Sequence, residues 1–103
     1  LQPEHLAPAT SKQILSRMLS NLLGIYSAND HPRALAAIER ILLIDPGSAP
    51  HIRDRGLLLS RVGDRTGAIA ELERYLEIAP NAADADSVRT QIMSIRRSQA
   101  RLN

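Results

Sequence analysis

ALAAIERILLIDP, the stretch from Ala34 to Pro46, decides the fold, because AIAELERYLEIAP, from Ala68 to Pro80, repeats its pattern 34 residues later. The matching positions include small, aliphatic and charged residues as well as the final proline. They pair Ala34 with Ala68, Ile38 with Leu72, Glu39 with Glu73, Arg40 with Arg74, Leu42 with Leu76, Ile44 with Ile78 and Pro46 with Pro80. Self-similarity at a fixed period of this length indicates a repeat architecture, in which each repeat is one supersecondary unit.

The same offset extends upstream of the two stretches. It places Asn29-Asp30 on Gly63-Asp64, Met18 on Ile52, and Ile25 on Leu59. The first half of each unit is therefore predicted to keep the register of the second half.

Each unit is predicted to form two helices joined by a turn, because apolar residues recur at i, i+3 and i+4. Thr10-Ser11-Lys12-Gln13 has the spacing of a capping box, and Ser48 is predicted to cap the third helix. Pro32 suits the first turn of the second helix, and Pro46 ends that helix because the residue before a proline disfavours helical geometry. The predicted helices run from about residue 10 to 28, from 32 to 44, from 49 to 62, from 65 to 78 and from 83 to 102.

Small residues mark the points where the two helices of a unit approach each other. Helices pack at axis distances of about 8–10 Å, and the closest approach needs a small side chain. Ala34 and Ala68 supply it in the second helices of the two units, and Gly56 supplies it in the first helix of the second unit. We expect these positions to be buried.

Composition excludes several classes of function. The 103 residues make one domain and include no cysteine, which excludes disulfides, thiol catalysis and sulfur-based zinc sites. Aromatic residues make up only 2% of the chain, too few for stacking nucleic-acid bases, and the net charge of +2 is not gathered in one stripe. No apolar run approaches the roughly 20 residues of a membrane helix. We expect a soluble, cytoplasmic chain with no nucleic-acid or membrane partner.

No motif for catalysis, cofactor binding or metal binding is found in the sequence. The histidines, His5, His31 and His51, are scattered along the chain and do not suggest a metal site. The glycines occur singly rather than in a phosphate-binding loop, and no serine lies in a nucleophile motif. The sequence is therefore predicted not to be an enzyme and to bind no cofactor.

The second unit carries a recognisable repeat pattern. Its residues at the characteristic offsets are Gly56, Leu59, Ala68, Leu72, Tyr75 and Pro80. With a period of 34 residues, this pattern resembles the tetratricopeptide repeat (TPR). The resemblance implies an all-α, TPR-like right-handed superhelix, with two helix-turn-helix repeats followed by a C-terminal capping helix.

A narrower resemblance is carried by residues 17–26, 53–58 and 72–77. These segments are similar to the C-terminal TPR region of bacterial transglutaminase-like proteins of the invasion-regulator type, in which a transglutaminase-like domain precedes the repeats. This resemblance implies four segments: a leader or linker from a missing N-terminal domain (1–10), TPR 1 (11–46), TPR 2 (47–80) and the capping helix (81–103).

In the TPR family the first helix of each pair lines a concave face, so the resemblance also implies partner-binding residues. They combine leucines and one tyrosine with arginine and polar side chains, which suits an amphipathic helix or an extended peptide with apolar anchors and an acidic residue. The predicted residues are Leu19, Leu23, Tyr26, Arg53, Leu57, Ser60, Arg61 and Gln91, with Ser27, Ser87 and Ser94 beside them.

Two functions remain open at this point. The chain is either a non-catalytic interaction module that binds a separate protein or peptide through the concave face, or an auxiliary domain that docks onto its own transglutaminase-like domain. The exposed apolar residues Leu19, Leu23 and Tyr26 could also be covered by the leader or by a second copy of the chain, so self-association is a third possibility.

Overall fold

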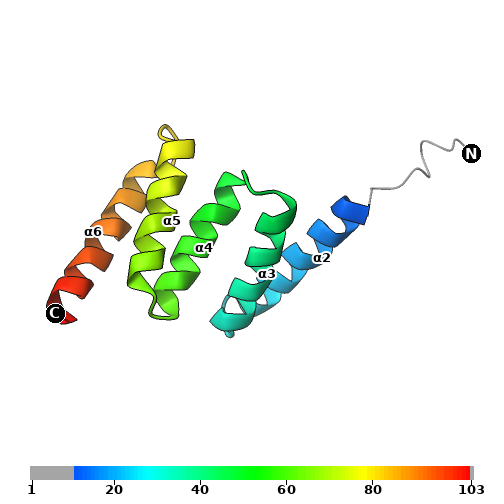
Figure 1. Cartoon of the computed structure of the whole chain (residues 1–103), viewed down its shortest axis with the longest axis horizontal. Helices are drawn as coiled ribbons and strands as arrows, with labels where there is room; N and C mark the ends of the chain where they lie inside the picture. Colours follow the sequence, from blue (N-terminus) through cyan, green and yellow to red (C-terminus); the bar gives the residue numbers. More distant parts are fainter. Residues whose placement is uncertain (1–10, 103) are drawn as a thin grey trace, which may run out of the picture.

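The computed structural model describes residues 11–102, and it contains five helices and no strand within that range (Figure 1). The predicted all-α fold is thereby confirmed. The helices are α2 (Ser11–Tyr26), α3 (His31–Ile44), α4 (Ala49–Arg61), α5 (Arg65–Ile78) and α6 (Ala85–Leu102). The predicted leader, Thr10 of the predicted capping box and Asn103 lie outside the described residues.

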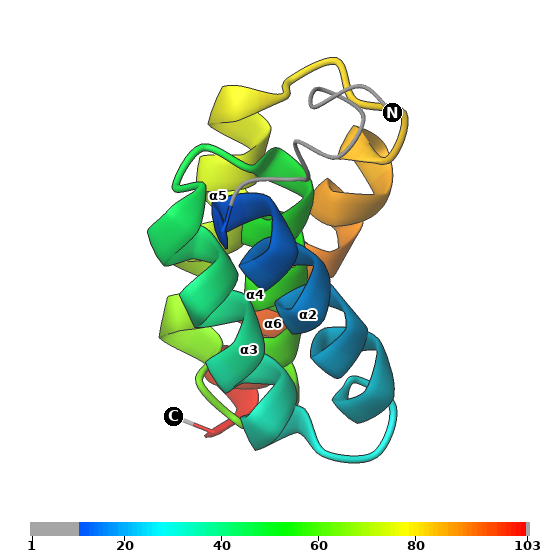
Figure 2. The same ribbon diagram turned by 90° about the vertical axis from the view of Figure 1, so that its right-hand side faces the viewer.

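The helices stand side by side in chain order, with α2 and α6 at the two ends of the row (Figure 1). Each helix packs mainly on its neighbours in sequence: α2 on α3, α4 on both α3 and α5, and α6 on α5. Seen along the row, α2 and α3 lie in front of the other helices (Figure 2). The chain is therefore two helix pairs, α2–α3 and α4–α5, with α6 covering the second pair.

An aspartate caps the second helix of each pair. Asp30 Oδ1 accepts a hydrogen bond from the backbone N–H of Arg33 at 3.1 Å, and Asp64 Oδ1 accepts one from Gly67 at 2.9 Å. Each bond satisfies one of the amides that a helix N-terminus leaves without a partner. The turn residues identified in the sequence therefore also start the helices that follow them.

Two details at helix ends differ from the predictions. Ser48 occupies the N-cap position of α4, but its hydroxyl bonds to Nδ1 of His51 at 2.7 Å instead of to a backbone amide. The last helix begins at Ala85 rather than at about residue 83. The backbone N–H of Val88 bonds to the carbonyl oxygen of Asp84 at 2.9 Å, which leaves the Asp84 side chain outside the helix and free for other contacts.

The closest approach within the second pair lies at Gly56. A Cβ atom added to Gly56 would lie 2.8 Å from Cγ of Leu72 and 3.3 Å from the backbone oxygen of Ala68. Ala34 and Ala68 are both 0% exposed, so their predicted burial is confirmed. Small residues therefore permit the tight packing of α4 on α5.

Aliphatic side chains form two buried clusters. The smaller one joins α3 and α4 through Ala34, Ile38 and Leu58, with Leu23 and Tyr26 of α2 packed against it. The larger one joins α4, α5 and α6 and comprises Ile52, Leu59, Ala68, Ile69, Leu72, Tyr75, Val88, Ile92 and Ile95. The core thus runs along the row and is continuous with the predicted stacking of one pair on the next.

The turns of the two pairs close differently. In the second pair Gly63 has a φ of +92°, and the N–H of Asp64 bonds to the carbonyl oxygen of Leu59 at 2.9 Å, the six-residue closure of a Schellman motif. In the first pair the N–H of Asp30 bonds to the carbonyl oxygen of Tyr26 at 2.7 Å, a five-residue closure. Among the described residues only glycine adopts positive φ. The first turn therefore lacks the left-handed residue and is one residue shorter.

This difference corrects the predicted register of the first helix. Tyr26 corresponds to Leu59, so α2 aligns with α4 at an offset of 33, not 34. Met18 and Ile25, which were predicted to align with buried residues, are 57% and 64% exposed. One residue corresponds to a rotation of about 100° around a helix axis, so α2 turns a different face towards α3 than the repeat period predicts.

The glycine contact predicts opposite effects of the same substitution at two positions. Gly56→Ala should destabilise the chain by about 1–3 kcal/mol, because the new methyl group overlaps the buried Leu72 side chain. Gly24→Ala is the matched control: nothing lies within 4 Å of its Cβ position, so removing a helical glycine should stabilise the chain by up to about 1 kcal/mol. Urea unfolding of both variants measures the difference, and equal stability would contradict the close approach at Gly56.

Candidate binding groove

A groove runs across α2, α4 and α6. A hollow of about 550 Å³ lies between α2 and α4, and a second of about 310 Å³ lies between α4 and α6. The first is lined by Leu23, Ser27, Ala28, Asp54, Leu57, Leu58 and Arg61. The second is lined by Leu57, Ser60, Arg61, Gln91, Ser94 and Ile95. Because Leu57 and Arg61 belong to both hollows, the two form one surface, called here the groove.

Most of the residues predicted to bind a partner lie in this groove. The structure brings together Leu23, Leu57, Ser60, Arg61 and Gln91, with Ser27 and Ser94 beside them. Ser87 is exposed but does not line either hollow. The structure shows this juxtaposition, and the binding role of these residues remains a prediction.

Leu19 and Tyr26 do not lie in the groove. Leu19 was expected to be exposed, but it is only 5% exposed and is part of the core. The Tyr26 ring lies beneath Arg33, whose Cζ is 5.7 Å from the ring centroid, and both residues line a separate hollow of about 220 Å³ between α2 and α3. The rotation of α2 that follows from its shorter turn explains both corrections.

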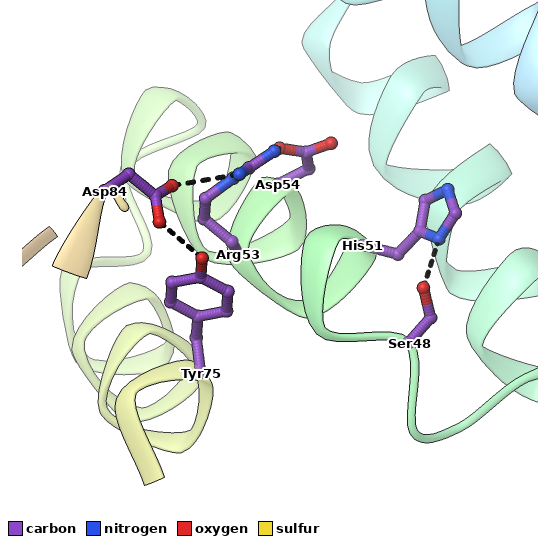
Figure 3. A network of polar contacts seen from close by, with 6 residues as sticks. All are labelled: Ser48, His51, Arg53, Asp54, Tyr75 and Asp84. Atoms are coloured by element: carbon purple, nitrogen blue, oxygen red, sulfur yellow. Dashed lines mark hydrogen bonds and ion pairs between the residues drawn. The ribbon is translucent and has the colours of Figure 1, made fainter. Parts of the chain in front are cut away.

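Arg53 is held by a polar network at the edge of the groove (Figure 3). Its guanidinium donates to Asp54 Oδ1 at 3.0 and 3.1 Å and to Asp84 Oδ2 at 2.9 Å, and its Cζ lies 5.9 Å from the Tyr75 ring centroid. The Tyr75 hydroxyl donates to the other oxygen of Asp84. The predicted binding residue Arg53 is therefore engaged in joining α4, α5 and the start of α6.

The same network shifts the pKa values of two of its members. The hydrogen bond from Tyr75 lowers the pKa of Asp84 and Arg53 lowers it further, against the opposing effect of burial. That hydrogen bond also raises the pKa of Tyr75, and burial and the Asp84 charge raise it further, outweighing Arg53. Asp84 is therefore held as the carboxylate and Tyr75 as the neutral phenol.

Two polar groups of the groove have no partner within the described residues. The Arg61 guanidinium forms no hydrogen bond or ion pair there, in contrast to Arg53. Oε1 of Gln91 is buried and accepts no hydrogen bond. A cation without a counter-ion and a buried acceptor without a donor both favour a ligand that supplies a carboxylate and an N–H group.

The sequence analysis missed four residues that line the groove: Ala28, Asp54, Leu58 and Ile95. At an offset of 33, Ala28 takes the place of Arg61, so a shorter first turn was the signal that would have identified it. The absence of a glycine at position 29, where the second unit has Gly63, carries that signal.

Within residues 11–102 no three histidine, aspartate or glutamate side chains lie close enough together to hold a metal ion. None of the helices in this range is both long enough and apolar enough to cross a membrane.

The network around Asp84 predicts a pH-dependent stability. Asp84→Asn should lower the thermal midpoint of the chain at pH 7, because the variant loses the carboxylate that joins α4, α5 and α6. A lowered folded pKa stabilises above the ordinary value of 3.8, and this contribution is lost as the pH falls below it. The difference between wild type and Asp84→Asn should therefore shrink from about pH 4 downwards.

Thermal denaturation followed by circular dichroism from pH 7 to pH 2.5 measures this difference. Asp86→Asn is the control, because the Asp86 side chain is 98% exposed and pairs only with Arg89 one turn away. A midpoint of Asp84→Asn equal to that of Asp86→Asn at pH 7 would contradict the role of the network.

Comparison with known proteins agrees with the repeat fold. Residues 22–93 match the tetratricopeptide repeat family. The chain is 37% identical over 91 residues to the "UPF0162 protein" of Xylella fastidiosa strain Temecula1, which covers 87% of this chain and 32% of that protein. It is 32% identical over 99 residues to the "UPF0162 protein" of Haemophilus influenzae, covering 93% of this chain and 36% of that protein. No solved structure matches significantly.

The chain thus spans about a third of the length of the curated relatives it matches. The predicted similarity to transglutaminase-like proteins is not shown by these comparisons. The family match covers most of the chain and coincides with the two helix pairs and the first half of α6. The chain belongs to the tetratricopeptide repeat family.

Proposed function

We propose that this chain is a non-catalytic protein-interaction module, and that it binds an extended or helical segment of another protein in the groove of α2, α4 and α6. The observation that supports this most directly is the continuity of the groove through Leu57 and Arg61, which places an apolar contact beside a cation that has no partner within residues 11–102. Apolar anchors with a polar rim are typical of peptide-binding surfaces.

The side chains of the groove define the chemistry of the segment. Leu23, Leu57 and Ile95 offer apolar contacts along its length, and Arg61 lies between the two hollows. Gln91 Oε1 would accept an N–H from the segment, which satisfies a buried acceptor. The preferred ligand is therefore a peptide with an aliphatic or aromatic anchor and an acidic residue a few positions away.

A second candidate function is docking of the same groove onto another part of a longer polypeptide, for which the sequence resemblance suggests a transglutaminase-like domain. The observation in favour is that the curated relatives are about three times as long as the matched region. Under this alternative, hydrogen exchange of α4 and α6 would be slower in the full-length protein than in this chain. A groove that exchanges equally in both would favour the separate partner.

Selection from a random peptide library tests the main proposal. The immobilised chain should enrich peptides that contain an apolar anchor and an acidic residue, and Leu57→Asp or Arg61→Glu should weaken the selected peptides about tenfold or more. Leu43→Asp is the matched control: Leu43 is 81% exposed on α3, away from the groove, and its substitution should leave the affinity unchanged.

Circular dichroism of each variant separates loss of binding from loss of fold. If no peptide is enriched, or if Leu43→Asp weakens binding as much as Leu57→Asp, the groove is not the binding surface.

A further inference from the structure

The outward side of α2 is apolar and has no cover. Five large side chains lie within about 100° around the helix and are between 37% and 64% exposed. They are Ile14, Leu15, Met18, Leu22 and Ile25, called here the α2 stripe. A contiguous exposed surface of this kind marks a contact site.

The repeat itself shows what covers the corresponding surface elsewhere. Ile25 corresponds to Leu58 of α4 at the corrected offset of 33, and Leu58 corresponds to Ile92 of α6 at the offset of 34. Leu58 is 6% exposed and Ile92 is 5% exposed, whereas Ile25 is 64% exposed. One repeat position is therefore buried in two helices and open in the first.

In both buried cases the cover includes the helix that comes immediately before in the chain. Leu58 packs in a cluster with Ala34 and Ile38 of α3. Ile92 lies in the cluster that includes residues of α5, on which α6 packs. Viewed along the row, no described helix stands in front of α2 and α3 (Figure 2). The stacking position of α2 is therefore unoccupied within residues 11–102.

The α2 stripe is more apolar than its counterpart in α4. Arg55 of α4 forms ion pairs with Glu39 of α3 at 3.5 Å and with Glu71 of α5 at 3.4 Å, whereas α2 has Leu22 at this position. Met18 likewise replaces His51. The stripe also extends through Ile14 and Leu15, whose counterparts Gly47 and Ser48 lie before α4. The missing cover is thus an apolar surface that follows α2 for most of its length.

Charges at the border of the stripe argue against a second copy as the cover. Arg17 on α2 and Arg40 on α3, which lines one hollow together with Leu22, form no ion pair within the described residues. The sixteen residues of α2 include Lys12 but no acidic residue. A symmetric dimer through this face would bring these cations together, so acidic residues are required on the other side.

The relatives supply a source for such a surface, since about two thirds of their length lies outside the region matched by this chain. We propose that the α2 stripe is the stacking surface for a helix of the same polypeptide that precedes α2. That helix places small and aliphatic side chains against Met18, Leu22 and Ile25, as α3 does against Leu58, and directs an acidic residue towards Arg17 or Arg40. This proposal does not depend on what the groove binds.

Thiol accessibility tests it, because the chain has no cysteine of its own. Ile25→Cys is made in this chain and in the protein lengthened at its N-terminus by its natural upstream sequence. The rate of maleimide labelling is followed by mass spectrometry of the peptide that contains residue 25. Labelling should be at least about tenfold slower in the lengthened protein. Leu43→Cys, at an equally exposed position on α3, is the control and should react equally fast in both.

Two outcomes would overturn the proposal. Equal labelling of Ile25→Cys in both proteins would show that the upstream sequence leaves the stripe open. Protection already present in the short chain, rising with protein concentration, would identify a second copy as the cover. As an independent measurement, Ile25→Glu should leave the thermal midpoint of the short chain unchanged and lower that of the lengthened protein.

Discussion

The close approach of α4 and α5 at Gly56 is the contact on which the rest of the structure depends. Leu72 fills the space that a side chain at position 56 would take, and Ala68 brings the two backbones together beside it. The larger buried cluster is built around this contact and extends from it to α6. Since neither helix pair buries its apolar surfaces alone, the geometry of this pair sets where both α3 and α6 find their cover.

A single backbone conformation determines how the first pair differs from the second. Gly63 adopts a left-handed conformation and closes a Schellman motif, whereas the first turn has no such residue and reaches its capping aspartate one residue sooner. The consequence is a rotation of α2 that buries Leu19 and exposes Met18 and Ile25. A glycine in a turn thereby decides which side chains of a helix face the core, the groove or the open end of the row.

The polar residues of the concave side divide into two groups with different roles. Arg53, Asp54, Tyr75 and Asp84 satisfy one another and join three helices, so their charges are already engaged. Arg61 and Gln91 lie close by but have groups without partners within the described residues. The two arginines of α4 could not be distinguished in the sequence, because the partner of Arg53 comes from Asp84, which lies 31 residues away.

The amino-acid sequence by itself determined the helix pairs, their caps, the buried alanines and the participation of Leu57, Ser60, Arg61 and Gln91 in one groove. These features follow from local rules: apolar periodicity, capping residues, and a period of 34 that places equivalent residues on equivalent faces. Only the tertiary structure decided the register of α2, the burial of Leu19, the engagement of Arg53 and the open stripe at the end of the row. These depend on the closure of one turn and on contacts between residues far apart in the chain, and neither is encoded in the spacing of residue types.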